Sequence, residues 1–289
     1  MDMRHTLTEG DATHLDIDGL RLAYRDAGDG PTVLCLHAVG HGSRDFAALR
    51  ARVGASVRLV TLDWPGHGSS ADDPATASAP RYAEILARVV EALALDRPVI
   101  LGNSIGGAAA IRYAAAHPDR VGALIVSDAG GLLPIDRTVR AFCGAMAAAY
   151  RRGTLGARWF PLFYAAQYQV LLRGRAAREH RRRIVAAGRA MAPVLEQAWR
   201  SFAREEADIR ALVPEVRCPV LLAWARSDPY NAYRGAKAAL DGFRDARTVL
   251  FAGGHAPFIE APDGFARTLI EFVHSLPTAE ASPGRASVG

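Results

Sequence analysis

A serine between two glycines is the first residue of this chain whose setting could support chemistry. Ser104 lies in the run Gly102–Gly106, which has the pattern G-x-S-x-G. A strand-like run at 98–101 precedes it, and a helical pattern at 105–116 follows it. Between a strand and a helix, such glycines let the chain turn sharply, so that the hydroxyl is exposed and the first helical amides point at it. The pattern predicts Ser104 as a nucleophile.

A serine hydroxyl needs a base that takes its proton, and one histidine is well placed to supply it. His255 follows two glycines and lies between the last strand-like run and the last helical pattern. The imidazole in turn needs a carboxylate that fixes its tautomer and stabilises its charged form. Asp228, in the loop after the strand-like run 220–224, is the predicted acid, and Asp128, after the run 121–126, is the alternative.

A tetrahedral intermediate also needs hydrogen-bond donors for its oxyanion. We expect one donor to be the amide of Ile105, directly after the serine, and the other to be the amide of Val39. Val39 lies in the loop after the strand-like run 31–36, where His37 is expected to have a structural role. His37 and His41 are spaced i, i+4, but this loop has no acidic residue between them, so no metal site is predicted.

Strand-like runs and longer helical patterns alternate along the chain, which predicts a mostly parallel sheet with helices on its faces. The alternation stops from about 132 to 212, where Ala- and Arg-rich helical stretches are broken at Gly144, Gly153, Pro161, Gly174 and Pro193. We interpret 13–133 and 213–276 as one α/β core and 134–212 as an inserted all-helical cap. Residues 1–12 form an N-terminal segment, and 277–289, rich in Ala, Ser, Gly and Pro, are expected to be a flexible tail.

The composition fits an ordinary globular enzyme, with 50% hydrophobic and 22% charged residues. No apolar run has the length of a signal peptide or a membrane span, so we expect a cytoplasmic protein without a membrane partner. Three widely spaced cysteines fit a reducing compartment. The net charge of +5 comes almost entirely from arginine. The densest arginine run, at 173–183, is read as a solvated helix face, with recognition of a substrate anion as the alternative. It lacks the interleaved aromatic residues of a nucleic-acid surface.

These residues together resemble the α/β-hydrolase superfamily. The chain order Ser104, Asp228, His255 is that family's order of nucleophile, acid and base. The run Asp63–Ser69 resembles the family's D-x-P-G-x-G-x-S loop. The resemblance covers about 15–133 and 214–276, and it implies an eight-stranded sheet, a helical cap over the site and no cofactor. Ala38 departs from the glycine that usually follows the first histidine of the oxyanion loop.

The residues and the resemblance predict a hydrolase that cleaves small carboxylic esters or related acyl compounds through an acyl-enzyme. Asn103-Ser104 also resembles the meta-cleavage-product hydrolases, which cut C–C bonds. Those enzymes, however, have a Gly-rich oxyanion loop and an aromatic residue after the histidine, where this chain has Ala38 and Val39 in the loop and Ala256 after His255. A slow-turnover ligand-binding protein with the same fold is a further alternative, and the oligomeric state stays open.

Overall fold

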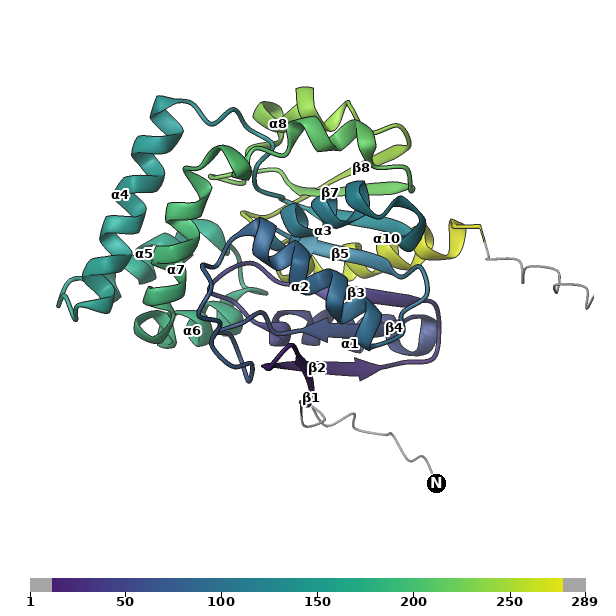
Figure 1. Ribbon diagram of the computed structural model, residues 1–289, viewed down its shortest axis with the longest axis horizontal. Coiled ribbons are helices and arrows are strands. Elements are labelled where there is room, and N and C mark those ends of the chain that lie inside the picture. The colour runs from purple at the N-terminus through teal and green to yellow at the C-terminus, as the bar shows by residue number, and fades with distance from the viewer. Residues whose placement is uncertain (1–11, 278–289) are drawn as a thin grey trace, which may run out of the picture.

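A computed structural model describes residues 12–277 and is built around an eight-stranded sheet (Figure 1). The predicted N-terminal segment and tail lie outside the described residues, except for Ala12 and Pro277. The strands are β1 (Thr13–Ile17), β2 (Leu20–Ala27), β3 (Thr32–Leu36), β4 (Arg58–Leu62), β5 (Val99–Asn103), β6 (Ala123–Ser127), β7 (Val220–Ala225) and β8 (Ala246–Phe251). Their order across the sheet is β1-β2-β4-β3-β5-β6-β7-β8. The pairs β1–β2 and β2–β4 are antiparallel and the others are parallel, which confirms the predicted fold.

The central strands are short apolar runs because both of their faces are covered. Every residue of β5, β6 and β7 is buried. On one face of the sheet α2 (Ala79–Ala92) packs beside α3 (Ile105–Ala116), and on the other α1 (Ala47–Val53) packs beside α10 (Pro262–Ser275) (Figure 1). The remaining core helices are α8 (Tyr233–Leu240) and α9 (Pro257–Glu260). The parallel strands therefore all end at one edge, where their loops can meet.

Four helices follow β6 and lie together beyond that edge of the sheet (Figure 1). They are α4 (Arg137–Thr154), α5 (Phe160–Leu171), α6 (Arg178–Ala186) and α7 (Gly188–Phe202), with α4 packed against α7. Helix α4 continues through Gly144 and Gly153, and α7 continues through Pro193, where the sequence predicted breaks. Gly153 is needed for packing, because a Cβ there would lie 2.6 Å from a ring atom of Phe160. No helix between residues 12 and 277 is both long and apolar enough to cross a membrane.

Candidate active site

Ser104 lies at the sharp turn between β5 and α3, with a φ of 55° and a ψ of −117°. A positive φ is unfavourable for a residue with a side chain, so the surroundings must hold the turn. The Ser104 amide donates to the carbonyl of Ser127 at 3.0 Å. A Cβ at Gly102 would lie 2.5 Å from the Gly106 carbonyl oxygen, and one at Gly106 would lie 2.5 Å from that of Leu36. The two glycines therefore let the turn pack against its neighbouring strand.

His255 and Asp228 form a buried pair beyond the ends of β8 and β7. His255 Nδ1 lies 2.8 Å from Asp228 Oδ2. The other carboxylate oxygen, Oδ1, accepts hydrogen bonds from the amides of Tyr230 at 2.8 Å and Asn231 at 2.9 Å. Because an ionised carboxylate can only accept, His255 donates through Nδ1, and its Nε2 is left as a base. His255 and Ser104 line one cavity.

A second carboxyl group, that of Asp128, lies beside this pair. Atoms of Asp128, Asp228 and His255 all lie within 4.8 Å of one another. Burial and the charge of Asp228 raise the pKa of Asp128 well above its usual range. Burial would also raise the pKa of Asp228, but His255 and the two backbone amides lower it below its ordinary value. These opposite shifts favour the proton on Asp128 and the ionised form of Asp228, the partner of the imidazole.

The same electrostatics decide how His255 titrates and whether the cluster suits a metal. Burial alone would lower the pKa of His255, but the charge and hydrogen bond of Asp228 raise it above its ordinary value. A metal ion bound to these groups would need deprotonated carboxylates and an unprotonated ring nitrogen directed at it. Here Nδ1 of His255 is directed at Asp228 Oδ2, and Asp228 Oδ1 accepts from two backbone amides, so these groups satisfy one another without a metal.

The loop after β3 is a tight turn whose position is set by histidines. The amide of His41 donates to the carbonyl of Ala38 at 3.2 Å, and Gly40 has a φ of 80°, as the third residue of a type II turn requires. Nε2 of His67 accepts from the amide of Gly40 at 2.8 Å, and Nε2 of His37 accepts from the amide of Trp64 at 3.0 Å. Val39 and Ile105 both line the cavity that contains Ser104. The turn therefore forms with alanine at position 38, where the family usually has glycine.

Two side chains that the sequence analysis missed hold the histidine loop. Glu260, in α9, accepts hydrogen bonds from the amides of Gly254, His255 and Ala256 at 2.8 to 3.0 Å. Glu260 also accepts from the amide of Arg173, which follows α5, at 2.6 Å. The signal for Glu260 was an acidic residue in the short helix directly after the histidine loop.

Asn103 is the second missed side chain. Its Nδ2 donates to the carbonyl of His255 at 3.0 Å and to that of Ser127 at 3.1 Å. It is completely buried and joins the end of β5 to the histidine loop. The position of Asn103 before the serine was noted in the sequence, but its partners are far away along the chain.

The cavity that holds Ser104 and His255 has a volume of about 180 Å³ and is lined in part by the inserted helices. Most of its wall is apolar or aromatic. Among the described residues that line it there is no arginine, lysine, aspartate or glutamate. The arginine run at 173–183 therefore contributes nothing to the wall. The inserted helices supply Val139, Phe142, Cys143, Tyr150, Gln167, Tyr168, Leu171, Leu195, Trp199 and Phe202.

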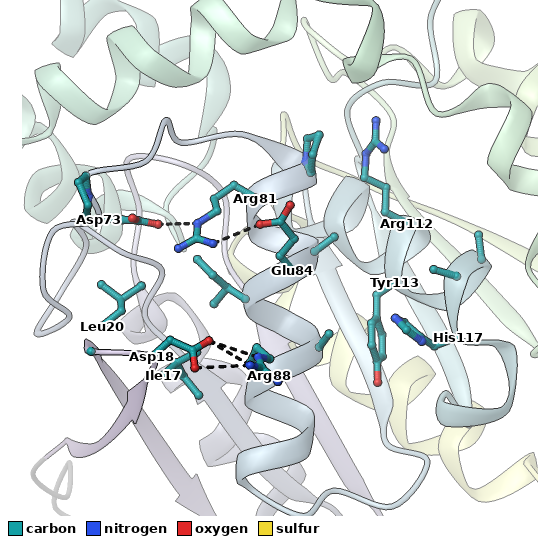
Figure 2. A pocket seen from close by; sticks show the side chains of 18 of the residues that line it. Ile17, Asp18, Leu20, Asp73, Arg81, Glu84, Arg88, Arg112, Tyr113 and His117 are labelled. Carbon is teal, nitrogen blue, oxygen red and sulfur yellow. Dashed lines mark hydrogen bonds and ion pairs between the residues drawn. The ribbon is translucent and has the colours of Figure 1, made fainter.

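A larger hollow of about 990 Å³ runs along α2, toward α3 and the β1–β2 turn (Figure 2). Two of the arginines that line it are paired with carboxylates, whereas the Nε of Arg112, which also lines it, is buried without a hydrogen-bond partner among the described residues. Arg81 contacts Asp73 at 2.8 Å and Glu84 at 3.2 Å, and Arg88 contacts Asp18 at 3.2 Å. The residues described as lining it include neither Ser104 nor His255. The smaller cavity is the candidate active site, because the nucleophile and base predicted from the sequence meet there.

The chain belongs to the alpha/beta hydrolase family, whose pattern matches residues 33–268. It is 25% identical, over 92% of this chain and 98% of the relative, to the 2-hydroxy-6-oxo-6-phenylhexa-2,4-dienoate hydrolase of Comamonas testosteroni. An uncharacterized protein of Mycobacterium tuberculosis is 33% identical over 40% of this chain, and the match spans only 34% of that protein's length. The fold is similar to that of a thermophilic esterase from Thermogutta terrifontis, with a TM-score of 0.77 at 23% identity over 93% of this chain and 100% of that one.

Proposed function

We propose that this protein is a serine hydrolase that cleaves small, uncharged carboxylic esters or related acyl compounds. One observation carries the proposal: Ser104, on its strained turn, and His255, bound to Asp228 at 2.8 Å, face a single cavity. This is the combination of nucleophile, base and orienting acid that acyl transfer through serine requires. The proposed reaction needs water as its only co-substrate.

In the proposed mechanism Ser104 Oγ attacks the ester carbonyl while His255 Nε2 takes its proton. Asp228 stabilises the imidazolium, and the amides of Val39 and Ile105 donate to the oxyanion. The tetrahedral intermediate then collapses, and the alcohol leaves with the proton from His255. A water molecule, deprotonated by His255, attacks the acyl-enzyme, and the acid leaves as Ser104 regains its proton.

The cavity wall supports an uncharged substrate. A carboxylate or phosphate in this site would lose its hydration with no arginine or lysine among the described wall residues to pair with. The relative from Comamonas testosteroni acts on a dienoate, which is an anion. The Nδ2 of Asn103, a residue that is part of the resemblance to C–C bond hydrolases, already donates to two backbone carbonyls. These features favour ester cleavage over C–C bond cleavage.

Intact-protein mass after exposure to a fluorophosphonate probe tests the nucleophile. We expect one adduct on the wild type and none on Ser104→Ala. Ser201→Ala is the matched control, because Ser201 is a buried serine of α7 whose hydroxyl donates to the carbonyl of Ala198 at 2.8 Å. That variant should be labelled like the wild type. An unlabelled wild type would contradict the proposal.

An ester panel and a vinylogous dienoic acid then separate the alternatives. Turnover of 4-nitrophenyl acetate or butanoate with little activity on the dienoic acid is the expected result. The reverse preference would establish C–C bond cleavage. Labelling without turnover of either substrate class would support the slow-turnover binding protein.

A further inference from the structure

A second histidine–carboxylate pair lies beside the proposed active-site cavity, with its histidine in the wall. His41 lines the cavity with Ser104 and His255 and is at the end of the turn that carries Val39. Its Nδ1 is hydrogen-bonded to Oδ2 of Asp45. Asp45 is completely buried in a short 3-10 helix, Ser43–Phe46. The mechanism above uses neither side chain.

Asp45 is held as an anion by groups from the inserted helices. Arg183 donates to its Oδ1, and His180 Nδ1 lies 3.6 Å from the same oxygen; both residues are in α6. Burial would raise the pKa of Asp45, but His41, His180 and Arg183 hold it well below its usual range. An ionised carboxylate accepts hydrogen bonds only. Asp45 therefore fixes the ring of His41 with Nδ1–H directed at it, and the opposite ring nitrogen, Nε2, remains for another partner.

A contact that only holds the core and the inserted helices together would not require the imidazole of His41. The contact between Asp45 and Arg183 already joins the two parts. The ring of His41 instead lies in the cavity wall, 5.6 Å from the ring of Tyr168, with only 2% of its side chain exposed. A polar group of a ligand is costly to bury in a mostly apolar cavity unless the wall offers it a hydrogen-bond partner, and the ring of His41 is such a partner.

We propose that His41 is a specificity-determining residue that hydrogen-bonds a hydroxyl group of the substrate, and that Asp45 is its positioning residue. The inference rests on the proposed ester hydrolysis and names the substrate class as hydroxylated esters. A hydroxyl suits Nε2 because it can both donate and accept. A hydroxyl is also uncharged, which suits a cavity whose described wall residues include no arginine or lysine.

The test compares esters that differ by one hydroxyl-to-methyl replacement. The 3-hydroxybutanoate and 3-methylbutanoate esters of one alcohol probe the acyl side, with the 2- and 4-hydroxy acids and their methyl counterparts beside them. The 2-hydroxypropyl and isobutyl esters of one acid probe the alcohol side. We expect the wild type to prefer the hydroxylated member of at least one pair by about 10-fold or more in kcat/KM. His41→Phe should bring that ratio close to one.

Two further variants separate recognition from a structural role. Asp45→Asn should weaken the hydroxyl preference in the same pair, and if it does not fold, His41→Phe alone decides. Tyr168→Phe is the control for the neighbouring ring and should keep the preference. Equal losses for both members of every pair in His41→Phe, no preference in the wild type, or loss of preference only in Tyr168→Phe would overturn the inference. Fluorophosphonate labelling of Ser104 reports on the proposed function separately, so the two failures can be distinguished.

Discussion

Replacing Asp228 with asparagine is expected to remove most of the catalytic rate while preserving the fold, because of how its two oxygens are held. Oδ1 accepts two backbone amides, from Tyr230 at 2.8 Å and Asn231 at 2.9 Å. An asparagine must place its carbonyl oxygen there, since its NH2 group would oppose both donors. The NH2 group then faces Nδ1 of His255, which must become an acceptor. The imidazole is forced to carry its proton on Nε2, where it cannot take the proton of Ser104.

The expected loss of rate is large because the replacement removes the function of the base, which is more than the loss of one hydrogen bond. In serine proteases the same replacement lowers kcat by about 10⁴, which corresponds to about 5.5 kcal/mol in the activation free energy. Asp128→Asn is the matched control. The raised pKa of Asp128 favours its neutral acid, so the exchange for an amide should leave the charge unchanged. The amide oxygen can still accept from the backbone amide of Ala225, which lies 2.9 Å from Oδ1 of Asp128 in the wild type. We expect kcat to change by less than about 10-fold, the scale of one hydrogen bond.

The assay is steady-state hydrolysis of an ester that the wild type cleaves, with melting temperatures to show that both variants are folded. Near-wild-type kcat in Asp228→Asn with a collapse in Asp128→Asn would mean that Asp128 is the catalytic acid. Equal collapse in folded forms of both variants would refute the assignment of the proton to Asp128. Only a large difference between the two variants agrees with the geometry.

Three further predictions concern the loops around the site. Glu260→Gln should lower kcat by about 10- to 100-fold, since one amide oxygen cannot serve the four N–H groups that Glu260 accepts; an unchanged rate would contradict this. Gly106→Ala should destabilise the protein by about 1–3 kcal/mol, measured by urea unfolding, because its Cβ would overlap the Leu36 carbonyl. The raised pKa of His255 should place the acidic limb of kcat/KM above about pH 6.5. The same proton stabilises the folded state at low pH, so this stabilisation should be lost as the pH rises through the raised pKa, more in the wild type than in a folded His255→Phe variant.

Much of the fold could be predicted because the signals for it are local. The central strands are short apolar runs covered on both faces, and the turn at Ser104 needs glycines that the sequence displays. The helix ends in the inserted segment could not be predicted in the same way. Gly153 reads as a helix breaker, yet it lies inside α4. The ring of Phe160 occupies the space that a side chain at this position would need, so a glycine is required there. That reason is a tertiary contact, which helix propensity does not contain.

The site was predictable to the extent that each residue carries its own local pattern. Ser104, His255 and Asp228 each follow a strand in a recognisable turn, and the structure brings His255 and Asp228 into contact. Asn103 and Glu260 were missed because their roles depend on partners rather than on their own surroundings. The hydrogen bond from Asn103 to His255 spans 152 positions of the chain, and no spacing rule can anticipate it.

The division into core and inserted helices describes the chain better than it describes the site. Glu260 joins the amide of Arg173 to the histidine loop, and Asp45 joins Arg183 to the loop that carries His41. Each of these contacts is a hydrogen bond to a carboxylate, of a kind that contributes about 1.5–3 kcal/mol to the free energy of unfolding. The inserted helices cannot lift away without breaking both, and each break would disturb a loop that borders the cavity. The position of these helices and the geometry of the loops proposed to carry the catalytic residues are therefore coupled. For that reason, a substitution in the insertion that touches no catalytic residue can still change kcat.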